Sequence, residues 1–477
     1  MQHMGIDFST FYIYRWRYYL GYGFIGLLLI GLLVFAGLYT PGGISVGEMT
    51  AVVRSSGIDI TNLQSLAITN APFYLLQDAS IHLFGVSDFS IKLPSLVLAF
   101  ISAAGLILLL RRWFKPRIAL LASIIAVTTG QFLFIAQSGT PGILYVLWSV
   151  WLLLLGTLIA KDARLRTLWK VLFFIVVALS LYTPLSIYAI VALGIAAVLH
   201  PHLRFIVRQL SKPKLLIAGI IGLIIAAPLI LGVVHTPELG LTLLGVPASW
   251  PNWGANLSTL VGQYLGFAAQ STTGLMTPVF GLGSMLIIGF GVYKLVRTRD
   301  STQSYLIIIW LICLIPVLVT NPSFTSVTFL PLVLLLATGL ESLLGYWYRL
   351  FPLNPYARLA GLIPLVVLVG ALVLSGLERY VYGYHYDPST VANFSQDLSL
   401  LPKDTKELVV SSDQVAFYQV VATHQKGLQI TTAATGDSFT TTNSAKADLP
   451  GVHVSQIITS SSSQSADRFY VYKKNGQ

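Results

Sequence analysis

Cysteine is almost absent from this sequence, and charged residues are scarce. The 477 residues include one cysteine, Cys313, so neither an intramolecular disulfide nor a cysteine-based metal centre is available. Charged residues make up 10% of the chain, whereas hydrophobic residues make up 55%. A water-soluble globule cannot bury that much apolar surface, and disordered or fibrous chains do not have this composition. The composition therefore predicts a membrane protein.

Long apolar runs account for the hydrophobic content. A helix needs roughly 20 mostly apolar residues to cross the bilayer core, and the sequence contains about eleven such runs. They lie near residues 19–39, 93–111, 117–137, 141–160, 167–182, 184–200, 214–234, 274–293, 303–320, 326–345 and 359–377. Only Thr183 and Pro184 divide the fifth run from the sixth, so one kinked helix is the alternative there. The first run exceeds a signal peptide's apolar region and lacks a small-residue cleavage site, which favours a retained anchor.

The positive charge lies mostly between these runs. A net charge of +11 could indicate nucleic-acid binding, but eleven spans and a cytoplasmic N-terminus place most Lys and Arg in short cytoplasmic loops. These residues are Arg15, Arg17, Arg111, Arg112, Lys115, Arg117, Lys161, Arg164, Arg166, Lys170, Arg204, Arg208, Lys212, Lys214, Lys294, Arg297, Arg299, Arg349 and Arg358. The short outer loops contain only Arg54 and Lys92. This follows the positive-inside rule, so we expect no nucleic-acid partner and a protein surrounded by membrane lipids, in a prokaryotic plasma membrane.

The expected fold class is an α-helical polytopic membrane protein with interfacial helices in its first outer loop and a small C-terminal extracytoplasmic α/β domain. The expected parts are a cytoplasmic N-terminus at 1–18, a transmembrane domain at 19–377 with its outer loop at 40–92, and the extracytoplasmic domain at 378–477. In the last part Ser, Thr, Asp and Lys replace the apolar runs. We expect helices at 390–401 and 414–425, strands at 408–412, 428–432, 452–459 and 469–473, and polar loops at 440–444 and 460–465. Without a Gly-rich phosphate loop or paired carboxylates, this domain is expected to pack or to position an acceptor.

Ionisable residues are almost absent from the predicted spans. Glu341 is the exception, and we expect it to meet cytoplasmic water near the inner end of the tenth run. An ion-coupled transporter would need buried Asp, Glu, His or Arg along its path, so the pattern argues against such transport. Trp250 and Trp253, in the outer segment 235–273, suit the membrane interface.

The first outer loop, 40–92, contains most of the candidate site residues. They are Glu48, Arg54, Asp59, Asp78, His82, Asp88 and Lys92. Such residues can supply a general base and a phosphate clamp, although solvated loop residues are the alternative for each one. Residues 47–53 indicate the start of a helix with Glu48 in its first turn, where a carboxylate complements the helix dipole.

Residues 71–85 of this loop could form an interfacial helix lying flat in the headgroups. The side chains expected on the lipid side are Phe73, Leu76, Ile81 and Phe84. Lys92 then opens the second run with a cation at headgroup depth, suited to a lipid phosphate.

The order of these motifs resembles the C-type (GT-C) membrane glycosyltransferases, in the bacterial branch similar to protein mannosyltransferases and the lipid A aminoarabinose transferase. That family carries an Asp-Glu pair after the first span, a His/Lys-Pro-Pro-Leu-Tyr stretch, Leu-Phe-Gly, and Arg-Leu-Pro-Ser at the second span. This chain has Gly47-Glu48, Asn70-Ala71-Pro72-Phe73-Tyr74, Leu83-Phe84-Gly85 and Lys92-Leu93-Pro94-Ser95. Further similarities are Arg111-Arg112-Trp113-Phe114 after the second span, Thr140-Pro141-Gly142 before the fourth, and Thr328-Phe329-Leu330-Pro331 late in the chain.

The resemblance implies a polyprenyl-phosphate sugar donor and a lipid, protein or glycan acceptor at the outer face. It implies that Glu48 is the catalytic carboxylate, with Asp59 or Asp78 as possible helpers. Lys92, Arg54 and His82 would bind the donor phosphate, and Asn70 and Tyr74 would line the donor or acceptor cavity. No cofactor is firmly implied, although a divalent metal ion is used by part of the class.

The chain departs from the family pattern at two acids. Gly47 replaces the first acid of the pair, and Gly142 replaces the acid that opens the fourth span. Three hypotheses therefore stay open: an active transferase, an inactive relative that acts in binding or assembly, and a carrier of lipid-linked sugar.

Overall fold

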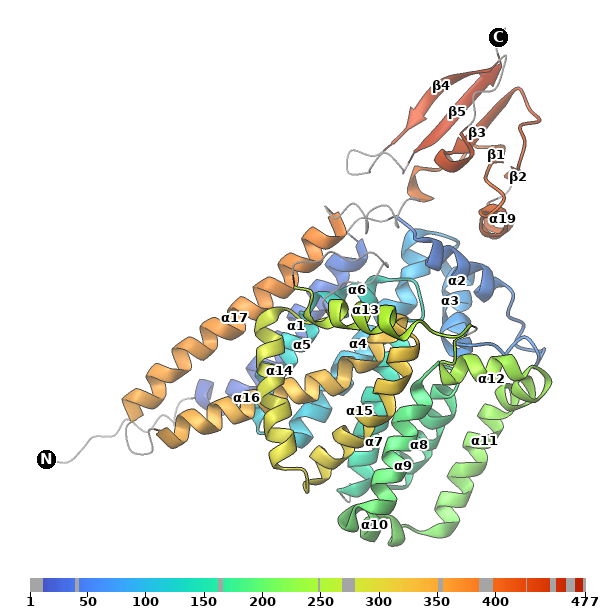
Figure 1. Ribbon diagram of the computed structural model, residues 1–477. Helices are drawn as coiled ribbons and strands as arrows, with labels where there is room; N and C mark the ends of the chain where they lie inside the picture. Colours follow the sequence, from blue (N-terminus) through green and yellow to red (C-terminus); the bar gives the residue numbers. More distant parts are fainter. Residues whose placement is uncertain are drawn as a thin grey trace, which may run out of the picture.

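The computed structural model describes residues 12–38, 43–161, 166–247, 249–267, 279–350, 355–385, 398–425, 427–446, 452–459 and 468–474. Most of these residues form a bundle of helices, and a five-stranded sheet lies beyond one end of the bundle (Figure 1). We call this end the sheet end. The opposite end carries the short helix α10 (Pro201–Arg208) and is called the α10 end (Figure 1).

The described helices of the bundle follow one another along the chain. They are α1 (Tyr12–Leu38), α2 (Val46–Ser56), α3 (Ala71–Phe84), α4 (Asp88–Trp113), α5 (Pro116–Val127), α6 (Gly130–Gln137), α7 (Ile143–Ala160), α8 (Arg166–Ser180), α9 (Ser186–Leu199), α10, α11 (Lys212–His235), α12 (Pro237–Leu244), α13 (Trp253–Leu265), α14 (Leu282–Arg297), α15 (Thr302–Thr320), the 3-10 helix η2 (Pro322–Thr328), α16 (Phe329–Leu350) and α17 (Pro355–His385).

Within the described residues, each predicted span overlaps one of these helices or a bent pair. Six helices among the described residues are long and apolar enough to cross a membrane, and the number rises to eight if each bent pair is one span. The pairs are α5 with α6, bent by 57°, and α9 with α10, bent by 92°. Shorter apolar helices lie within α1 and α8. The chain is thus an integral membrane protein, whereas the total of eleven spans stays a prediction.

The fifth and sixth predicted spans are separate helices. α8 ends at Ser180 and α9 begins at Ser186, so the alternative of one kinked helix is wrong. Leu185 in the intervening turn adopts the left-handed backbone conformation with φ 63°, which is unfavourable for a bulky residue. Its backbone N–H donates to the Leu243 carbonyl oxygen at 2.9 Å, which ties the turn to α12.

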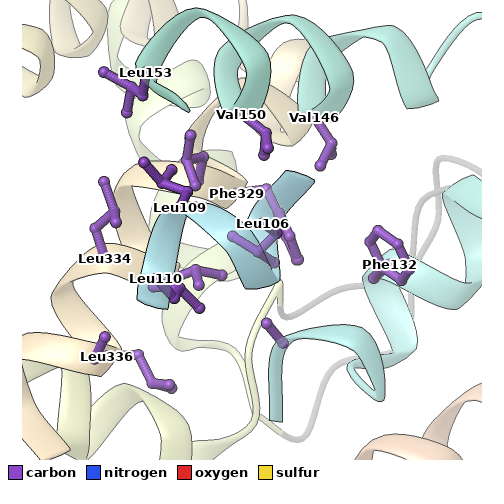
Figure 2. Close-up of a cluster of buried hydrophobic side chains, with 14 of the residues drawn as sticks. Leu106, Leu109, Leu110, Phe132, Val146, Val150, Leu153, Phe329, Leu334 and Leu336 are labelled. Atoms are coloured by element: carbon purple, nitrogen blue, oxygen red, sulfur yellow. The ribbon is translucent and has the colours of Figure 1, made fainter. Parts of the chain in front are cut away.

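The core of the bundle is centred on α4. Figure 2 shows side chains of α4, α6, α7 and α16 converging in this apolar cluster. The labelled residues are Leu106, Leu109, Leu110, Phe132, Val146, Val150, Leu153, Phe329, Leu334 and Leu336. The Phe329 ring stacks with the rings of Phe132 and Phe280, each at a centroid distance of 5.8 Å.

Glycines allow α14 and α16 to approach closely. A Cβ atom at Gly291 would overlap the carbonyl oxygen of Leu335, and one at Gly339 would overlap that of Ile287. Small residues at helix interfaces permit this backbone contact within membranes. Toward the α10 end of α14 and α16, Glu341 forms a salt bridge with Lys294. Glu341 was expected to meet water, and the structure also gives it an ionic partner.

The sheet has the strand order β2-β1-β3-β5-β4. Its strands are β1 (Glu407–Val409), β2 (Gln429–Thr431), β3 (Ser438–Thr442), β4 (Val452–Ile458) and β5 (Phe469–Lys474), with α19 (Val415–His424) between β1 and β2. β1 pairs in parallel with β2 and β3, whereas β5 pairs antiparallel with β3 and β4. The expected strands at 408–412, 428–432, 452–459 and 469–473 and the helix at 414–425 are confirmed with small shifts of their ends.

One predicted loop of this domain is wrong. Residues 440–444 were expected to form a polar loop, but Ser438–Thr442 is β3, an inner strand of the sheet. Phe439 is buried, and three consecutive threonines follow it; threonine is β-branched and is enriched in strands. The loop expected at 460–465 lies outside the described residues. So does most of the helix expected at 390–401, of which Leu398–Leu400 form a 3-10 turn.

The sheet domain packs on α2 and α3, which belong to the predicted outer loop 40–92. A shared apolar cluster contains Met49 and Val52 of α2 together with Phe417 and Tyr418 of α19. Ile81 of α3 also belongs to it. The expectation that α3 lies flat in the headgroups is therefore only partly right, because Phe73 and Ile81 are buried in protein while Leu76 and Phe84 are exposed.

The buried carboxylate of Glu407, in β1, binds the turn that precedes β3. Glu407 accepts hydrogen bonds from the backbone N–H groups of Thr435 and Gly436, both at 2.8 Å, and from the hydroxyls of Thr435 and Thr431. Burial alone would raise the pKa of Glu407, but these hydrogen bonds to the charged form bring the pKa below its ordinary value.

The contact between α14 and α16 predicts a position-dependent effect of alanine. We expect Gly339→Ala to lower the free energy of unfolding by about 1–3 kcal/mol, because the added methyl group must push the helices apart. Gly289→Ala is the matched control, since a Cβ atom at Gly289 meets nothing within 4 Å. Thermal unfolding of both variants in the same detergent checks this, and equal melting temperatures would contradict the close contact.

Glu407 predicts a pH-dependent stability of the sheet. Because its pKa is lowered on folding, the stabilisation is present above the unfolded pKa and is lost as the pH falls through the folded pKa. We expect Glu407→Gln to lower the free energy of unfolding of the sheet by about 1–3 kcal/mol at pH 7. The variant should also lose less stability than the wild type when the pH falls. Hydrogen exchange of β1, corrected for intrinsic rates, measures the effect. The exposed Asp404→Asn serves as control, and an unchanged profile in Glu407→Gln would refute the role.

Candidate functional site

The site begins at the N-terminus of α2, which a capping box fixes. The Ser45 hydroxyl accepts from the Glu48 backbone N–H at 3.2 Å, and the Glu48 carboxylate accepts in return from the Ser45 N–H at 2.8 Å. The sequence Ser-x-x-Glu is the known pattern for this reciprocal arrangement. It places Glu48 in the first turn of α2, as predicted.

The Glu48 side chain points into the protein. It is 0% exposed, and its Oε1 accepts from the Gly139 backbone N–H at 2.6 Å while Oε2 accepts from the Ser45 N–H and hydroxyl. A Cβ atom at Gly139 would lie 2.7 Å from Ile91 Cγ2 and 3.2 Å from Glu48 Oε1, so this position favours glycine. Gln77 completes the junction by donating to the carbonyl oxygens of Ile91 and Gly139. Both Glu48 oxygens are thus engaged: Oε1 holds α2 to the turn between α6 and α7, and Oε2 caps the N-terminus of α2.

Lys92 lies in the same interior region. It is 2% exposed, and its Nζ donates to the Gly43 carbonyl oxygen at 3.2 Å. Glu48 and Lys92 therefore both contact the segment 43–45, from α2 and from α4. The structure brings these two predicted residues together, but it buries the Lys92 ammonium that was expected at headgroup depth.

The two glycines that replace the family's acids also come together. A Cβ atom at Gly47 would lie 3.5 Å from Thr140 Cγ2, and one at Gly142 would lie 3.7 Å from Thr140 Oγ1. Thr140 is partly exposed, and its hydroxyl forms a 2.8 Å hydrogen bond with that of Ser138. The Thr140 side chain therefore lies between the two glycines, with its methyl group toward Gly47 and its hydroxyl toward Gly142.

Arg54 lies on the exposed face of α2. Gly47, Thr50 and Arg54 are all exposed, and their spacing of three and then four residues places them on one face of the helix. From Gly47 to Arg54 this face runs about 10 Å along the axis. Glu48 points away from it, so the structure separates Glu48 from Arg54.

Arg54 lines a groove of about 520 Å³ at the sheet end. The groove lies between the end of α2, the segment 57–69 and α12, and its wall is mainly apolar with the hydroxyls of Ser65, Thr69, Thr236 and Thr242. Arg54 Nη1 donates to the Tyr74 hydroxyl at 3.5 Å. Tyr74 itself is 3% exposed, so it reaches the groove only through Arg54.

Asn70 fixes the start of α3 beside this groove. It adopts the left-handed conformation with φ 59°, which asparagine tolerates better than most residues. Its backbone N–H donates to the Tyr182 carbonyl oxygen at 2.7 Å. Its buried Oδ1 has no hydrogen-bond partner among the described residues.

The remaining predicted residues lie elsewhere. Asp59 is exposed, and hydrogen bonds from the Thr61 hydroxyl and backbone N–H lower its pKa. Asp78 contacts His82 at 3.2 Å, and the His82 ring lies 6.0 Å from that of His424 in the sheet domain. Burial raises the pKa of Asp78, while the charges of the two histidines offset part of the increase. Asp78 and His82 therefore belong to the contact with the sheet domain and not to the Glu48 junction.

The described residues do not provide a metal site. No group of three or more His, Cys, Asp or Glu side chains in the described part of the chain is placed to hold a metal ion. A divalent ion requires several oxygen ligands, so the residues present do not fit the metal that the resemblance allows.

Several site residues were missed by the sequence analysis. The Ser45 cap could have been found from its Ser-x-x-Glu pattern. Gln77, Gly139 and Thr140 could not, because Gly139 meets Glu48 across 91 positions of sequence. Only the folded bundle shows that contact.

Comparison with known sequences finds a family model that matches part of the chain. Residues 71–231, from the start of α3 into α11, match the family model of dolichyl-phosphate-mannose-protein mannosyltransferases. No curated protein matches the chain in sequence.

Two solved structures have a similar architecture. ArnT from Cupriavidus metallidurans bound to undecaprenyl phosphate is 13% identical with a TM-score of 0.50, and the match covers 94% of this chain and 98% of that one. The oligosaccharyltransferase of Archaeoglobus fulgidus tethered with an acceptor peptide is also 13% identical with a TM-score of 0.50, covering 87% of this chain and 64% of that one. The chain therefore has the fold of the GT-C membrane glycosyltransferases, and its residues 71–231 are similar to dolichyl-phosphate-mannose-protein mannosyltransferases.

Proposed function

We propose that the protein transfers a sugar from a polyprenyl-phosphate donor to an acceptor at the sheet end, the predicted outer face of the membrane. The observation that carries this proposal is the exposed face of α2, on which Arg54 lines an apolar groove and Gly47 adjoins Thr140. The GT-C fold and the sequence match over 71–231 support it. The acceptor is a hydroxyl-bearing lipid, protein or glycan.

The groove suits a lipid-linked phosphate. Its apolar wall can take the first part of a prenyl chain, and the Arg54 guanidinium can donate to phosphate oxygens. Arg54 is exposed there, whereas Lys92 is buried against the Gly43 carbonyl oxygen. Of the three predicted phosphate ligands, Arg54 is thus the best placed, because Lys92 is buried and His82 lies at the sheet domain.

In the proposed reaction the acceptor oxygen attacks the anomeric carbon. A new carbon–oxygen bond forms, the bond to the donor phosphate oxygen breaks with inversion, and the acceptor proton passes to a carboxylate. The polyprenyl phosphate leaves with its charge held by Arg54. Glu48 is the proposed carboxylate. Because it is buried and points away from the exposed face of α2, it can take the proton only when a hydrogen bond from Gly139 or Ser45 opens and its side chain turns toward that face.

A second candidate function is that of a non-catalytic relative used in binding or assembly. The engagement of both Glu48 oxygens favours it, as do the glycines at 47 and 142. In this case α2 keeps the donor groove and the contact with the sheet domain but lacks a carboxylate on its exposed face.

The variants Glu48→Gln and Gly47→Asp separate these two functions. If Glu48 is the base, Glu48→Gln lowers sugar transfer by roughly 100-fold or more. Transfer is measured in nanodiscs with a labelled polyprenyl-phosphate sugar and mixed hydroxyl acceptors. Melting temperatures are recorded in parallel because Glu48 also holds α2, and the exposed Glu238→Gln is the matched control. Undiminished transfer by a folded Glu48→Gln protein would exclude Glu48 as the base.

Gly47→Asp restores the first acid of the family pattern. The position accepts a side chain, since a Cβ atom there would make only ordinary contact with Thr140. A wild-type protein without transfer activity, together with a Gly47→Asp protein that transfers sugar, would establish the non-catalytic relative. If the wild type is active, we expect Gly47→Asp to change its rate by much less than Glu48→Gln does.

Arg54→Gln tests the donor groove. Loss of a charge-assisted hydrogen bond of about 1.5–3 kcal/mol predicts at least a tenfold weaker affinity for polyprenyl phosphate. Binding is measured by displacement of a fluorescent polyprenyl phosphate at constant ionic strength. Arg299→Gln, at the other end of the bundle, is the control, and equal affinities of the two variants would remove Arg54 from the phosphate site.

A further inference from the structure

A second cavity of about 520 Å³ lies at the α10 end, outside the site described above. It is bounded by α7, α8, α9, α10 and α15. A volume of this size lies within the range of small-molecule pockets in proteins, about 300–1,000 Å³. Most of its wall consists of Leu, Ile, Val, Phe, Ala and Gly side chains. The cavity can therefore take an apolar group of considerable size.

α10 forms one wall of this cavity. The chain bends by 92° between α9 and α10, and the apolar residues Leu203, Ile206 and Val207 of α10 line the cavity. Arg204 and Arg208 of the same helix are exposed and do not line it. A short amphipathic helix with basic residues on its polar face is typical of a segment that lies in the membrane interface. The cavity therefore opens at the level of lipid headgroups.

The polar lining of the cavity is cationic. Its polar and charged residues are Thr157, Lys161, Lys170, His202, Thr302 and Gln303, and no Asp or Glu is among the described residues that line it. The exposed Lys161 donates to the Arg112 carbonyl oxygen at 2.6 Å, and the buried Lys170 donates to the Ser211 hydroxyl at 3.3 Å. Two ammonium groups thus stand at the border of an apolar space.

The geometry points to a binding site for one anionic phospholipid, with an acyl chain in the cavity and its phosphate at the exposed Lys161, while the buried Lys170 adds positive charge to the cavity wall. The positive-inside rule predicts that the α10 end faces the cytoplasm, and the cytoplasmic leaflet is rich in anionic lipids. Basic pockets between membrane helices on that side are suited to phospholipid headgroups. The site is distinct from the donor groove, which lies at the sheet end, and it does not depend on the proposed transfer reaction.

Gly194 provides a direct way to fill the cavity. It lines the cavity in α9, and a Cβ atom at this position would meet nothing within 4 Å. Gly194→Leu therefore places a side chain in the space that we assign to the acyl chain, and its Cβ atom would not clash with a neighbouring atom. Gly289→Leu is the matched control, because Gly289 is equally free of contacts and does not line the cavity.

The test is native mass spectrometry of the full chain released from nanodiscs that contain equal amounts of phosphatidylglycerol and phosphatidylcholine, with added undecaprenyl phosphate. We expect one retained phosphatidylglycerol in the wild type and in Gly289→Leu, and at least a tenfold lower occupancy in Gly194→Leu. Lys161→Gln should weaken retention about fivefold, as expected from about 1 kcal/mol per basic residue. Arg204→Gln, which removes an exposed charge outside the cavity, should change it much less.

Three results would overturn the proposal. They are equal retention of phosphatidylcholine and phosphatidylglycerol, a bound undecaprenyl phosphate that is lost in Gly194→Leu or Lys161→Gln, and wild-type retention of phosphatidylglycerol in both Gly194→Leu and Lys161→Gln. Lys161 is exposed, so the Lys161→Gln protein should fold and keeps the test decisive if Gly194→Leu does not.

Discussion

The hydrogen bond from the Gly139 N–H to the Glu48 carboxylate is the contact on which the arrangement of the sheet end depends. A buried carboxylate is costly unless its charge is met by hydrogen bonds, and here Ser45 and Gly139 supply them from two parts of the chain. The contact fixes α2 against the turn between α6 and α7. The absence of a side chain at Gly139 is required for this approach, because Ile91 and Glu48 leave no room for a Cβ atom.

Once α2 is fixed, its different faces have different roles. Met49 and Val52 pack in the apolar cluster that holds the sheet domain. Gly47, Thr50 and Arg54 face outward along the route from Thr140 to the groove. One helix of eleven residues thus connects the sheet domain, the junction at Glu48 and the donor groove. Because α2 contacts both the sheet domain and the groove, we propose that the sheet domain helps to position α2.

Much of the fold could be predicted because its pattern is local. Apolar runs with basic ends located the helices of the bundle, and the pattern of residues 47–53 placed Glu48 in the first turn of α2. The β3 strand was missed because a run of threonines is polar by composition, although its β-branched side chains pack well in a sheet. The burial of Glu48 and Lys92 could not be predicted from the sequence either. Glu48 is held by the backbone of Gly139 and Lys92 by that of Gly43, and each partner lies far away in the chain.

The two cavities lie at opposite ends of the bundle, and these two ends differ in the number of basic residues in their short loops. The groove at Arg54 lies at the sheet end, where the short loops between predicted spans contain few basic residues. The cavity at Lys161 lies at the α10 end, where such loops contain many. The most direct test of the central claim is an electron cryomicroscopy structure in nanodiscs with a polyprenyl-phosphate sugar bound. The account predicts the donor phosphate within hydrogen-bonding distance of Arg54 and the sugar toward Gly47 and Thr140. A donor phosphate bound at the α10 end, or away from α2, would contradict it.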